Sequence, residues 1–160
     1  MEEINSISKV YLKLLKSIEW EDKLLTRGIK EGLNKFLSNA YLSFYKHKHY
    51  STHYITKNAL NKVKNKDFKG LVFEHLIPKQ KYIQEKCIEA AKLNKIDFDF
   101  IYNLLSKYWI LATVTAEENK IIGNKRSMPE GWEYTDEKSA LIRCTDVGVE
   151  LISNPFRKLK

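Results

Sequence analysis

The chain has 160 residues, long enough for one domain with a hydrophobic core and short for two. Its hydrophobic share of 43% and charged share of 30% are typical of a soluble globular protein, and no apolar run reaches the length of a membrane span. The net charge of +8 favours a polyanionic partner, and the acidic start, Met1-Glu2-Glu3, argues against a signal peptide, so we expect a cytoplasmic protein.

Two amphipathic helices are predicted at the start of the chain. Apolar residues recur at spacings of three and four over residues 2–18 and again over residues 26–45, where Thr26 would be the N-cap. Such stripes are typical of helices that face a core. They would also suit a homodimer interface built from the N-terminal helices.

A polar loop with three histidines is predicted over residues 46–53. The histidines are His47, His49 and His53. Their spacings of two and four leave three interpretations open: a metal site, contacts with nucleic acid, or an ordinary loop.

The positive charge is concentrated in the first half of the chain. Residues 46–69 contain seven lysines and a single acid, Asp67, and Thr56 would cap a short helix with a one-sided basic face. A local excess of this size attracts a polyanion. The simpler alternative is a solvated lysine surface.

The middle of the chain alternates strands and helices. A strand is predicted over residues 68–74 and a buried, β-branched strand over residues 109–114. Between them, residues 79–93 have helical spacing, and Asp97 would cap a second helix that ends near Tyr108. The two cysteines, Cys87 and Cys144, have no CxxC partner, so we expect buried thiols.

A third helix should begin directly after the second strand. Thr115 and Glu118 form a capping box, Asn119 lies in the first turn, and Gly123 should end the helix. The apolar periodicity is weaker after this helix. We predict an irregular segment over residues 124–135, a helix over residues 136–145 and a short strand over residues 147–152.

Three polar side chains can converge in this arrangement. Glu74 and His75 end the first strand, and a helix packed across the two strands would bring Asn119 back toward them. A carboxylate and an amide oxygen are suitable ligands for Mg²⁺. The imidazole can then remove a proton from water, because it titrates near neutral pH.

The sequence around these residues resembles the HNH (ββα-metal) endonucleases. Glu74-His75-Leu76-Ile77-Pro78 is similar to their first motif of acid, histidine, two aliphatic residues and proline. The stretch from Leu111 to Lys120, continuing from Gly123 to Pro129, is similar to their closing strand and metal-binding helix. The resemblance covers about residues 68–129. It implies that His75 is the general base and that Glu74 and Asn119 bind one divalent metal ion, Mg²⁺ or Mn²⁺.

The fold expected from these observations is α+β and mostly helical. An N-terminal helical layer is joined to a ββα-metal-like unit with a helical insertion between its two strands. We expect a single domain, 1–160, in which residues 1–67 form a helical, basic nucleic-acid-binding part, residues 68–129 the ββα-metal-like part and residues 130–160 a C-terminal extension.

The expected function is metal-dependent hydrolysis of phosphodiester bonds in nucleic acid, most simply DNA. Basic side chains would contact the nucleic-acid backbone: Lys57, Lys62, Lys64, Lys66, Lys69, Lys79, Lys120, Lys125 and Arg126. Two alternatives stay open. One is a non-catalytic nucleic-acid-binding accessory protein, and the other is a protein-interaction module such as a toxin, an antitoxin or an inhibitor. The sequence leaves undecided the target sequence, the choice of DNA or RNA, and nicking against double-strand cleavage.

Overall fold

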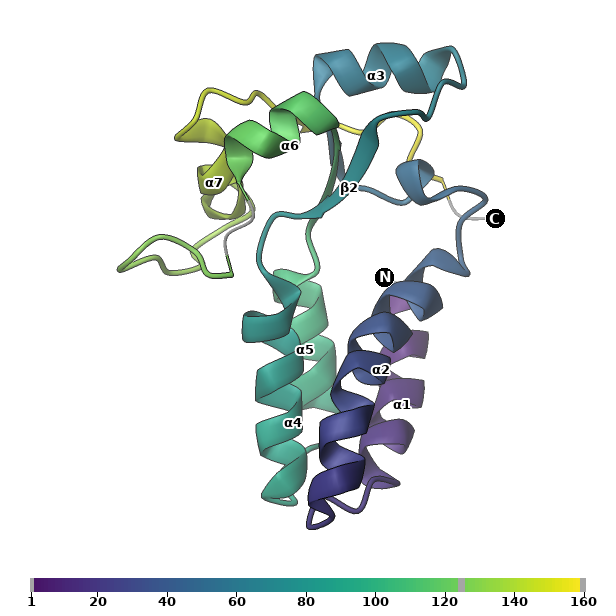
Figure 1. Ribbon diagram of the computed structural model, residues 1–160, viewed down its shortest axis with the longest axis vertical. Coiled ribbons are helices and arrows are strands. Elements are labelled where there is room, and N and C mark those ends of the chain that lie inside the picture. The colour runs from purple at the N-terminus through teal and green to yellow at the C-terminus, as the bar shows by residue number, and fades with distance from the viewer. Residues whose placement is uncertain (1, 124–125, 159–160) are drawn as a thin grey trace. The chain divides into compact units, whose positions relative to one another are not determined.

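The computed structural model describes residues 2–123 and 126–158 (Figure 1). In this part of the chain it has seven α-helices and one four-stranded mixed sheet, so the predicted α+β class is confirmed. Contacts divide the chain into two compact units. We call Met1–Phe44 with Lys79–Trp109 the helical unit, and Tyr45–Pro78 with Ile110–Lys160 the sheet unit.

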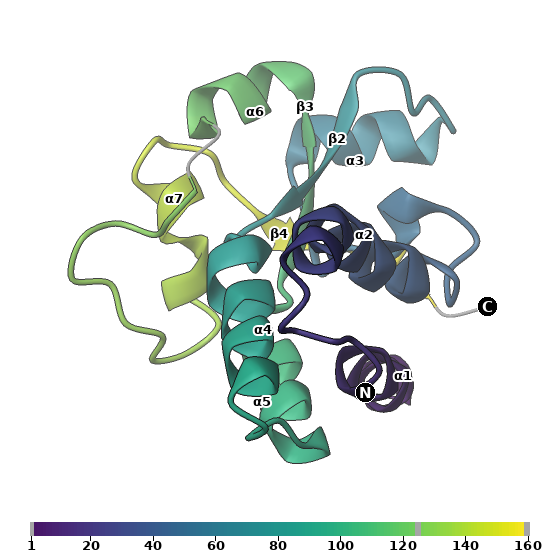
Figure 2. The ribbon, with the colours of Figure 1, turned by 60° about the horizontal axis from the view of Figure 1, so that its bottom comes forward.

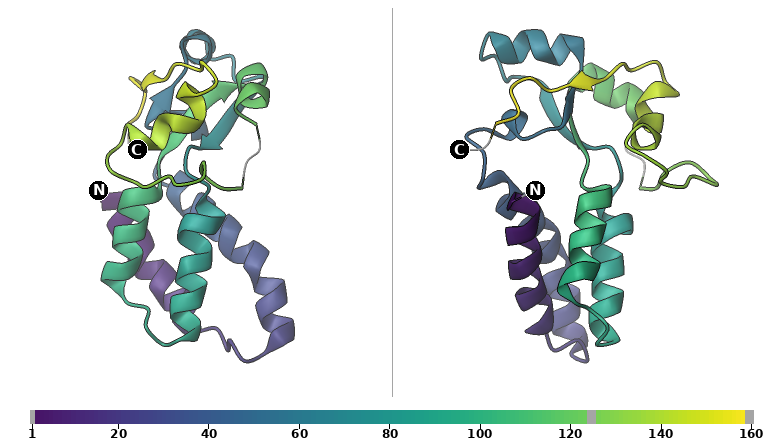
Figure 3. Two further views of the ribbon diagram at one scale, coloured as in Figure 1. Left: turned by 90° about the vertical axis from the view of Figure 1, so that its left-hand side faces the viewer. Right: turned by 180° about the vertical axis from the view of Figure 1, so that it is seen from behind.

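The helical unit joins the N-terminal helices to the segment between the two predicted strands. Its elements are α1 (Glu2–Lys16), α2 (Lys23–Leu42), a π-helical turn η2 (Gln80–Gln84), α4 (Glu85–Lys92) and α5 (Phe98–Tyr108). Helix α1 packs against α2, α4 and α5 (Figure 3). The predicted helical insertion is therefore present, and its apolar stripe is buried against the N-terminal helices.

Apolar side chains fill the interior of the helical unit. The fully buried ones include Tyr11, Leu15, Leu33, Leu37, Ile83, Ile101 and Leu105. The ring of Tyr11 also stacks on Phe36, with centroids 5.8 Å apart. Figure 2 shows α1 and α2 nearly end-on and α4 and α5 obliquely. Among the described residues, no helix is long and apolar enough to cross a membrane.

The start of α2 differs from the prediction. Asp22, not Thr26, is the N-cap, and its carboxylate accepts hydrogen bonds from the backbone N–H groups of Leu24 and Leu25 at 2.8 and 2.9 Å. The prediction was wrong because residues 23–25 face solvent and add nothing to the apolar stripe that marked the helix. The predicted N-caps Thr56 and Asp97 are confirmed by their side-chain hydrogen bonds to the first turns of α3 and α5.

The sheet unit is built on four short strands in the order β2-β3-β1-β4. They are β1 (Tyr54–Ile55), β2 (Leu71–His75), β3 (Leu111–Thr115) and β4 (Ile152–Ser153). The pair β2–β3 is antiparallel, as expected, and β1 runs parallel to β3. Strand β1 was not predicted, because two residues carry no periodicity. The predicted strand over residues 147–152 was wrong except at its last residue, because β4 consists of Ile152 and Ser153.

The sheet unit also contains three helices, of which α3 and α6 pack on the strands. The helices are α3 (Lys57–Lys64), α6 (Ala116–Ile122) and α7 (Ile142–Thr145), with short 3-10 turns η1 (Lys48–Tyr50) and η3 (Ser139–Leu141). Helix α3 buries Ala59 and Val63 against Ile55 and Leu71 of the sheet. Helix α6 follows β3 directly, and its predicted capping box and its predicted end at Gly123 are both confirmed.

Both cysteines are free and buried, as predicted. Cys87 lies in α4 and Cys144 in α7. Burial raises the pKa of the Cys87 thiol to about 12 and that of Cys144 to about 11, so both are neutral and unreactive at physiological pH.

Candidate functional site

Glu74 and His75 are the last two residues of β2. They pair with Ala112 and Leu111 of β3, so both belong to the regular ladder. Successive side chains on a strand point to opposite faces of the sheet. His75 accordingly lies beside Phe73, two residues earlier, with the rings edge to face at 5.7 Å. The side chains of Glu74 and His75 therefore point to opposite faces. A ligand could contact both only at the edge of the described sheet, where β2 is the outermost strand.

Glu74 forms an ion pair with an arginine that the sequence analysis did not single out. Arg143 Nη2 of α7 lies 3.3 Å from Glu74 Oε1, and the two side chains are 3% and 21% exposed. Burial raises the pKa of Glu74, and the positive charge of Arg143 opposes that shift. The carboxylate is thus held in place at the end of β2 with one oxygen on the arginine.

Arg143 also binds backbone carbonyl groups on two other elements. Its Nη1 donates to the carbonyl oxygens of His75 and Leu76 at 3.2 and 3.4 Å, and its Nη2 donates to Gly123 at 2.9 Å. One buried side chain therefore joins the end of β2 to the end of α6. The only sequence signal was its position among apolar residues in Leu141-Ile142-Arg143-Cys144, which is also common for surface helices.

Asn119 lies half-buried in α6, which packs against both β2 and β3. Its backbone carbonyl accepts the N–H of Gly123, which closes the last turn of the helix. The hairpin and the helix thus adopt the predicted ββα order, and Arg143 ties the C-terminal end of that helix to Glu74 and His75.

Glu74 and Asn119 are the two residues predicted to bind a metal ion. Within the described residues, no three His, Cys, Asp or Glu side chains are arranged to hold a metal ion. Mg²⁺ commonly takes only one or two protein oxygens and keeps its waters. Glu74 with the Asn119 amide would supply that number, and Arg143, which occupies one carboxylate oxygen, would weaken the attraction for a cation.

Most of the predicted basic residues are exposed in the sheet unit. Lys57 and Lys64 lie on α3, Lys66 and Lys69 follow it, and Lys120 lies on α6. Lys62, less exposed, pairs with Asp67. Arg126 is exposed after α6, and Lys125 lies outside the described residues.

Lys79 is the exception among the predicted basic residues. It belongs to the helical unit, where its ammonium group donates to the Asn34 carbonyl at 2.9 Å and to the Ser38 hydroxyl. Burial lowers its pKa to about 8. The Lys79 ammonium group therefore binds partners inside the helical unit, unlike the exposed basic residues of the sheet unit.

The three histidines after residue 46 have structural partners. His47 accepts the N–H of His49 at 3.4 Å and stacks on Phe68 with ring centroids 3.9 Å apart. His49 is fully buried with Nδ1 3.2 Å from the Thr113 hydroxyl, and His53 Nδ1 accepts the N–H of Leu111 at 3.2 Å. Of the three open interpretations, these contacts favour an ordinary loop fixed onto β3.

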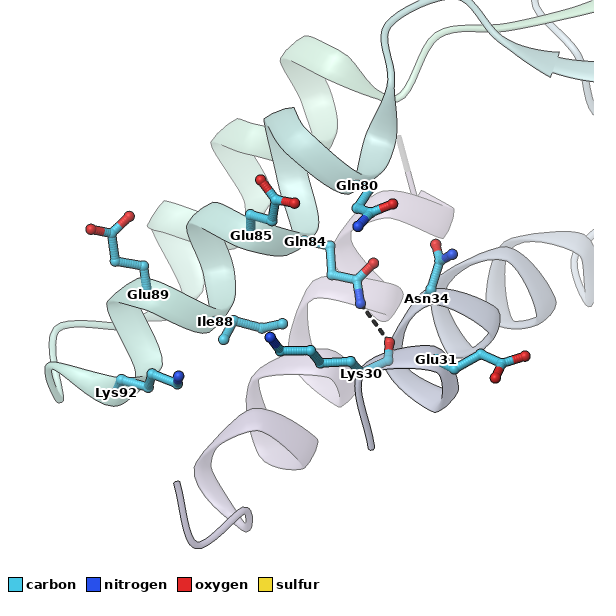
Figure 4. Close-up of a pocket in the computed structure, with 9 residues that line it drawn as sticks. All are labelled: Lys30, Glu31, Asn34, Gln80, Gln84, Glu85, Ile88, Glu89 and Lys92. Carbon is cyan, nitrogen blue, oxygen red and sulfur yellow. Dashed lines mark hydrogen bonds between the residues drawn. The ribbon is translucent and has the colours of Figure 1, made fainter. Parts of the chain in front are cut away.

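A cavity of about 450 Å³ lies within the helical unit, between α2 and the segment formed by η2 and α4 (Figure 4). Gln84 crosses it and donates from Nε2 to the carbonyl oxygen of Lys30 at 2.6 Å. Charged residues of both signs surround it, including Glu31, Glu85 and Lys92. None of the predicted site residues lines this cavity.

Comparisons of the chain with protein-family models, with curated proteins and with solved structures gave no match. The residues and contacts of the sheet unit are therefore the basis for a proposed function.

Proposed function

We propose that this chain is a metal-dependent endonuclease of the HNH type that hydrolyses phosphodiester bonds in DNA. The supporting observation is the order of the hairpin: Glu74 and His75 at the end of β2, the antiparallel strand β3, and the capped helix α6 directly after it. This is the layout that the resemblance over residues 68–129 implies. The exposed lysines of the same unit supply the attraction for DNA.

His75 acts as the general base in this proposal and removes a proton from the attacking water. Glu74 lies on the opposite face of the strand, so a scissile phosphate must approach the end of β2 from the open sheet edge. Within the described sheet, β2 is paired with β3 on one side and has no strand on the other.

Glu74 and Asn119 are the proposed ligands of one Mg²⁺ or Mn²⁺ ion. When bound, this ion would stabilise the negative charge that builds up on the phosphate and the leaving oxygen. Arg143 is a positioning residue: it orients the Glu74 carboxylate and holds the end of α6 against the end of β2. The basic residues Lys120 and Arg126 would contact the DNA backbone beside the site.

The test is cleavage of plasmid DNA by the purified chain with Mg²⁺ or Mn²⁺, with and without chelator, followed on a gel. We expect cleavage that the chelator stops, and a loss of about 100-fold or more in His75→Ala. His47→Ala serves as the matched control, because it removes a histidine of the same unit that has no proposed catalytic role. Cleavage by His75→Ala at the parent rate would exclude the assignment.

A non-catalytic DNA-binding protein is the second candidate. The observation that favours it is the ion pair of Glu74 with Arg143, which gives the carboxylate a purely structural role. In that case the chelator leaves DNA affinity unchanged, and no cleavage occurs with either metal.

A further inference from the structure

Helix α3 presents a polar face away from the sheet. Its buried side consists of Ala59 and Val63. The residues on the other side are all exposed: Lys57, Asn58, Asn61, Lys64 and the C-cap Asn65. At about 100° per residue, Asn61 lies at the centre of this face, with the lysines to one side and the other two asparagines to the other.

This helix is firmly anchored to the rest of the sheet unit. Thr56 caps its first turn, and the Thr56 hydroxyl donates to Glu118 Oε2 at 2.7 Å. The amide of Asn58 donates to Glu118 Oε1 at 3.0 Å, so this asparagine already has a partner. Burial alone would raise the pKa of Glu118, but these hydrogen bonds and that of the Thr115 N–H hold it below its usual value, so the anchor stays charged.

Positive charge lies on one side of this face and continues beyond the helix. Lys66 and Lys69 follow the helix, and the acid nearest in sequence, Asp67, is engaged by Lys62 and by the N–H of Lys69. Lys57 lies 3.4 Å from Glu150, but both side chains are more than 70% exposed, and such pairs contribute little. Lys57 can therefore exchange this partner for a phosphate.

The centre of the face carries amides instead of charge. The side chains of Asn61 and Asn65 form no hydrogen bond with another residue that the structure describes. Uncharged amides at the centre of the face would not strengthen binding to phosphate groups, which are attracted by lysine. An asparagine carboxamide can pair with N6 and N7 of adenine in the major groove.

The dimensions restrict the partner further. A helix with its side chains is about 10–12 Å across, and the major groove of B-form DNA is about 12 Å wide. The major groove of double-stranded RNA is too narrow for side chains to read. Duplex DNA is therefore the partner that this face fits.

We propose that α3 reads base edges in the major groove of duplex DNA, with Asn61 and Asn65 contacting bases and Lys57, Lys64 and Lys66 contacting the flanking phosphates. This rests on the proposed function only for the choice of DNA as substrate. It adds that binding is sequence-selective and favours sites that contain adenine.

The experiment is selection of bound duplexes from a random-sequence pool by the full-length chain in the presence of chelator, so that cleavage plays no part. The parent protein should enrich an adenine-containing site. Asn61→Ala should lower discrimination at one position of that site by roughly 5- to 150-fold, while its affinity for random duplex stays within about threefold. The double variant Lys57→Ala/Lys64→Ala should weaken all sequences alike and reduce the salt slope by about two.

Asn5→Ala, at an exposed position of α1, is the matched control and should retain the enriched site. No enrichment, enrichment that is unchanged in Asn61→Ala, or tighter binding to single-stranded DNA or duplex RNA would each overturn the proposal. His75→Ala should enrich the same site as its parent. The duplex selection thus tests base recognition by α3, and the plasmid assay separately tests cleavage.

Discussion

The two units of this chain are stabilised in different ways. The helical unit has a mostly apolar interior. Its buried Ser8 and Thr26 hydroxyls bond only to the carbonyl one turn earlier, and Gln84 and Lys79 each donate to a backbone carbonyl of α2. The sheet unit buries a hydrogen-bonded network: Thr113 Oγ1 lies 3.2 Å from His49 Nδ1 and 2.9 Å from the Thr52 hydroxyl. Asn154 extends it by donating to Thr52 Oγ1 at 2.8 Å and to the carbonyl of His49 at 2.9 Å.

The difference indicates where geometry is most strictly fixed. Apolar packing tolerates changes that conserve volume, whereas a buried hydrogen-bonded network requires particular donors and acceptors at particular distances. The sheet unit therefore has the more closely defined arrangement. The residues of the proposed site, Glu74, His75 and Asn119, all belong to it.

The largest effect on stability is expected at Arg143. Arg143→Met leaves Glu74 without its ion pair and removes the donors to Gly123 and His75, so the free energy of unfolding should fall by about 3–5 kcal/mol. The double variant Glu74→Gln/Arg143→Met should lose less than the sum of the two single changes, because the unpaired charge is gone. Urea denaturation of the four proteins measures this, and additive losses would contradict the coupling.

Acid should destabilise the sheet unit through His49. Burial lowers the pKa of this imidazole to about 4, and the positive charges of Lys48 and His47 add to that shift. A folded-state pKa below the unfolded value near 6.5 means that stability is full above pH 6.5 and is lost as the pH falls toward 4. Between pH 7.5 and pH 5 the parent should lose about 2 kcal/mol more than His49→Gln.

Denaturation curves of both proteins at the two pH values provide this measurement. Equal losses in the parent and in His49→Gln would show that another group causes the acid sensitivity.

A matched pair of hydroxyl deletions sharpens the comparison of the two units. Thr113→Val removes the centre of the network and leaves Thr52 and His49 without that partner, so we expect a loss of about 1–3 kcal/mol. Ser8→Ala removes a buried hydroxyl that bonds only to the Ile4 carbonyl of its own helix, and the loss should stay below about 1 kcal/mol. Equal losses would contradict the proposed difference between the units.

Two glycines, one in each unit, should respond to alanine with opposite signs. Gly123 ends α6 with φ at 73°, so Gly123→Ala should cost about 1 kcal/mol or more although its surroundings are open. Gly28 lies inside α2, also with open space around it, and Gly28→Ala should stabilise the protein by about 0.5–1 kcal/mol. Thermal denaturation should show a lower melting temperature for Gly123→Ala and a higher one for Gly28→Ala; shifts of the same sign would contradict this prediction.

The local features were predictable from the sequence, and the errors have identifiable causes. Apolar periodicity predicted α1, α4 and α5, and the capping box predicted the start of α6. The predicted strand began at Phe68, three residues before β2. The residues between them form a turn in which Asp67 accepts the N–H of Lys69 and Gly70 has a positive φ, and the sequence did not clearly indicate this turn. The order of strand, acid–histidine pair, strand and helix was also readable, because it follows from where apolar runs start and stop.

The sequence by itself determined most of the helices, the caps of α3, α5 and α6, and the two long strands, because those features follow from patterns among residues two to four positions apart. Only the tertiary structure decided that Arg143 meets Glu74 and the carbonyl of His75, which lies 68 residues away, and that Asn154 donates to the carbonyl of His49, 105 residues away. Such contacts depend on how distant segments pack, and a buried charge or amide finds its partner in space, so its sequence neighbours do not reveal it.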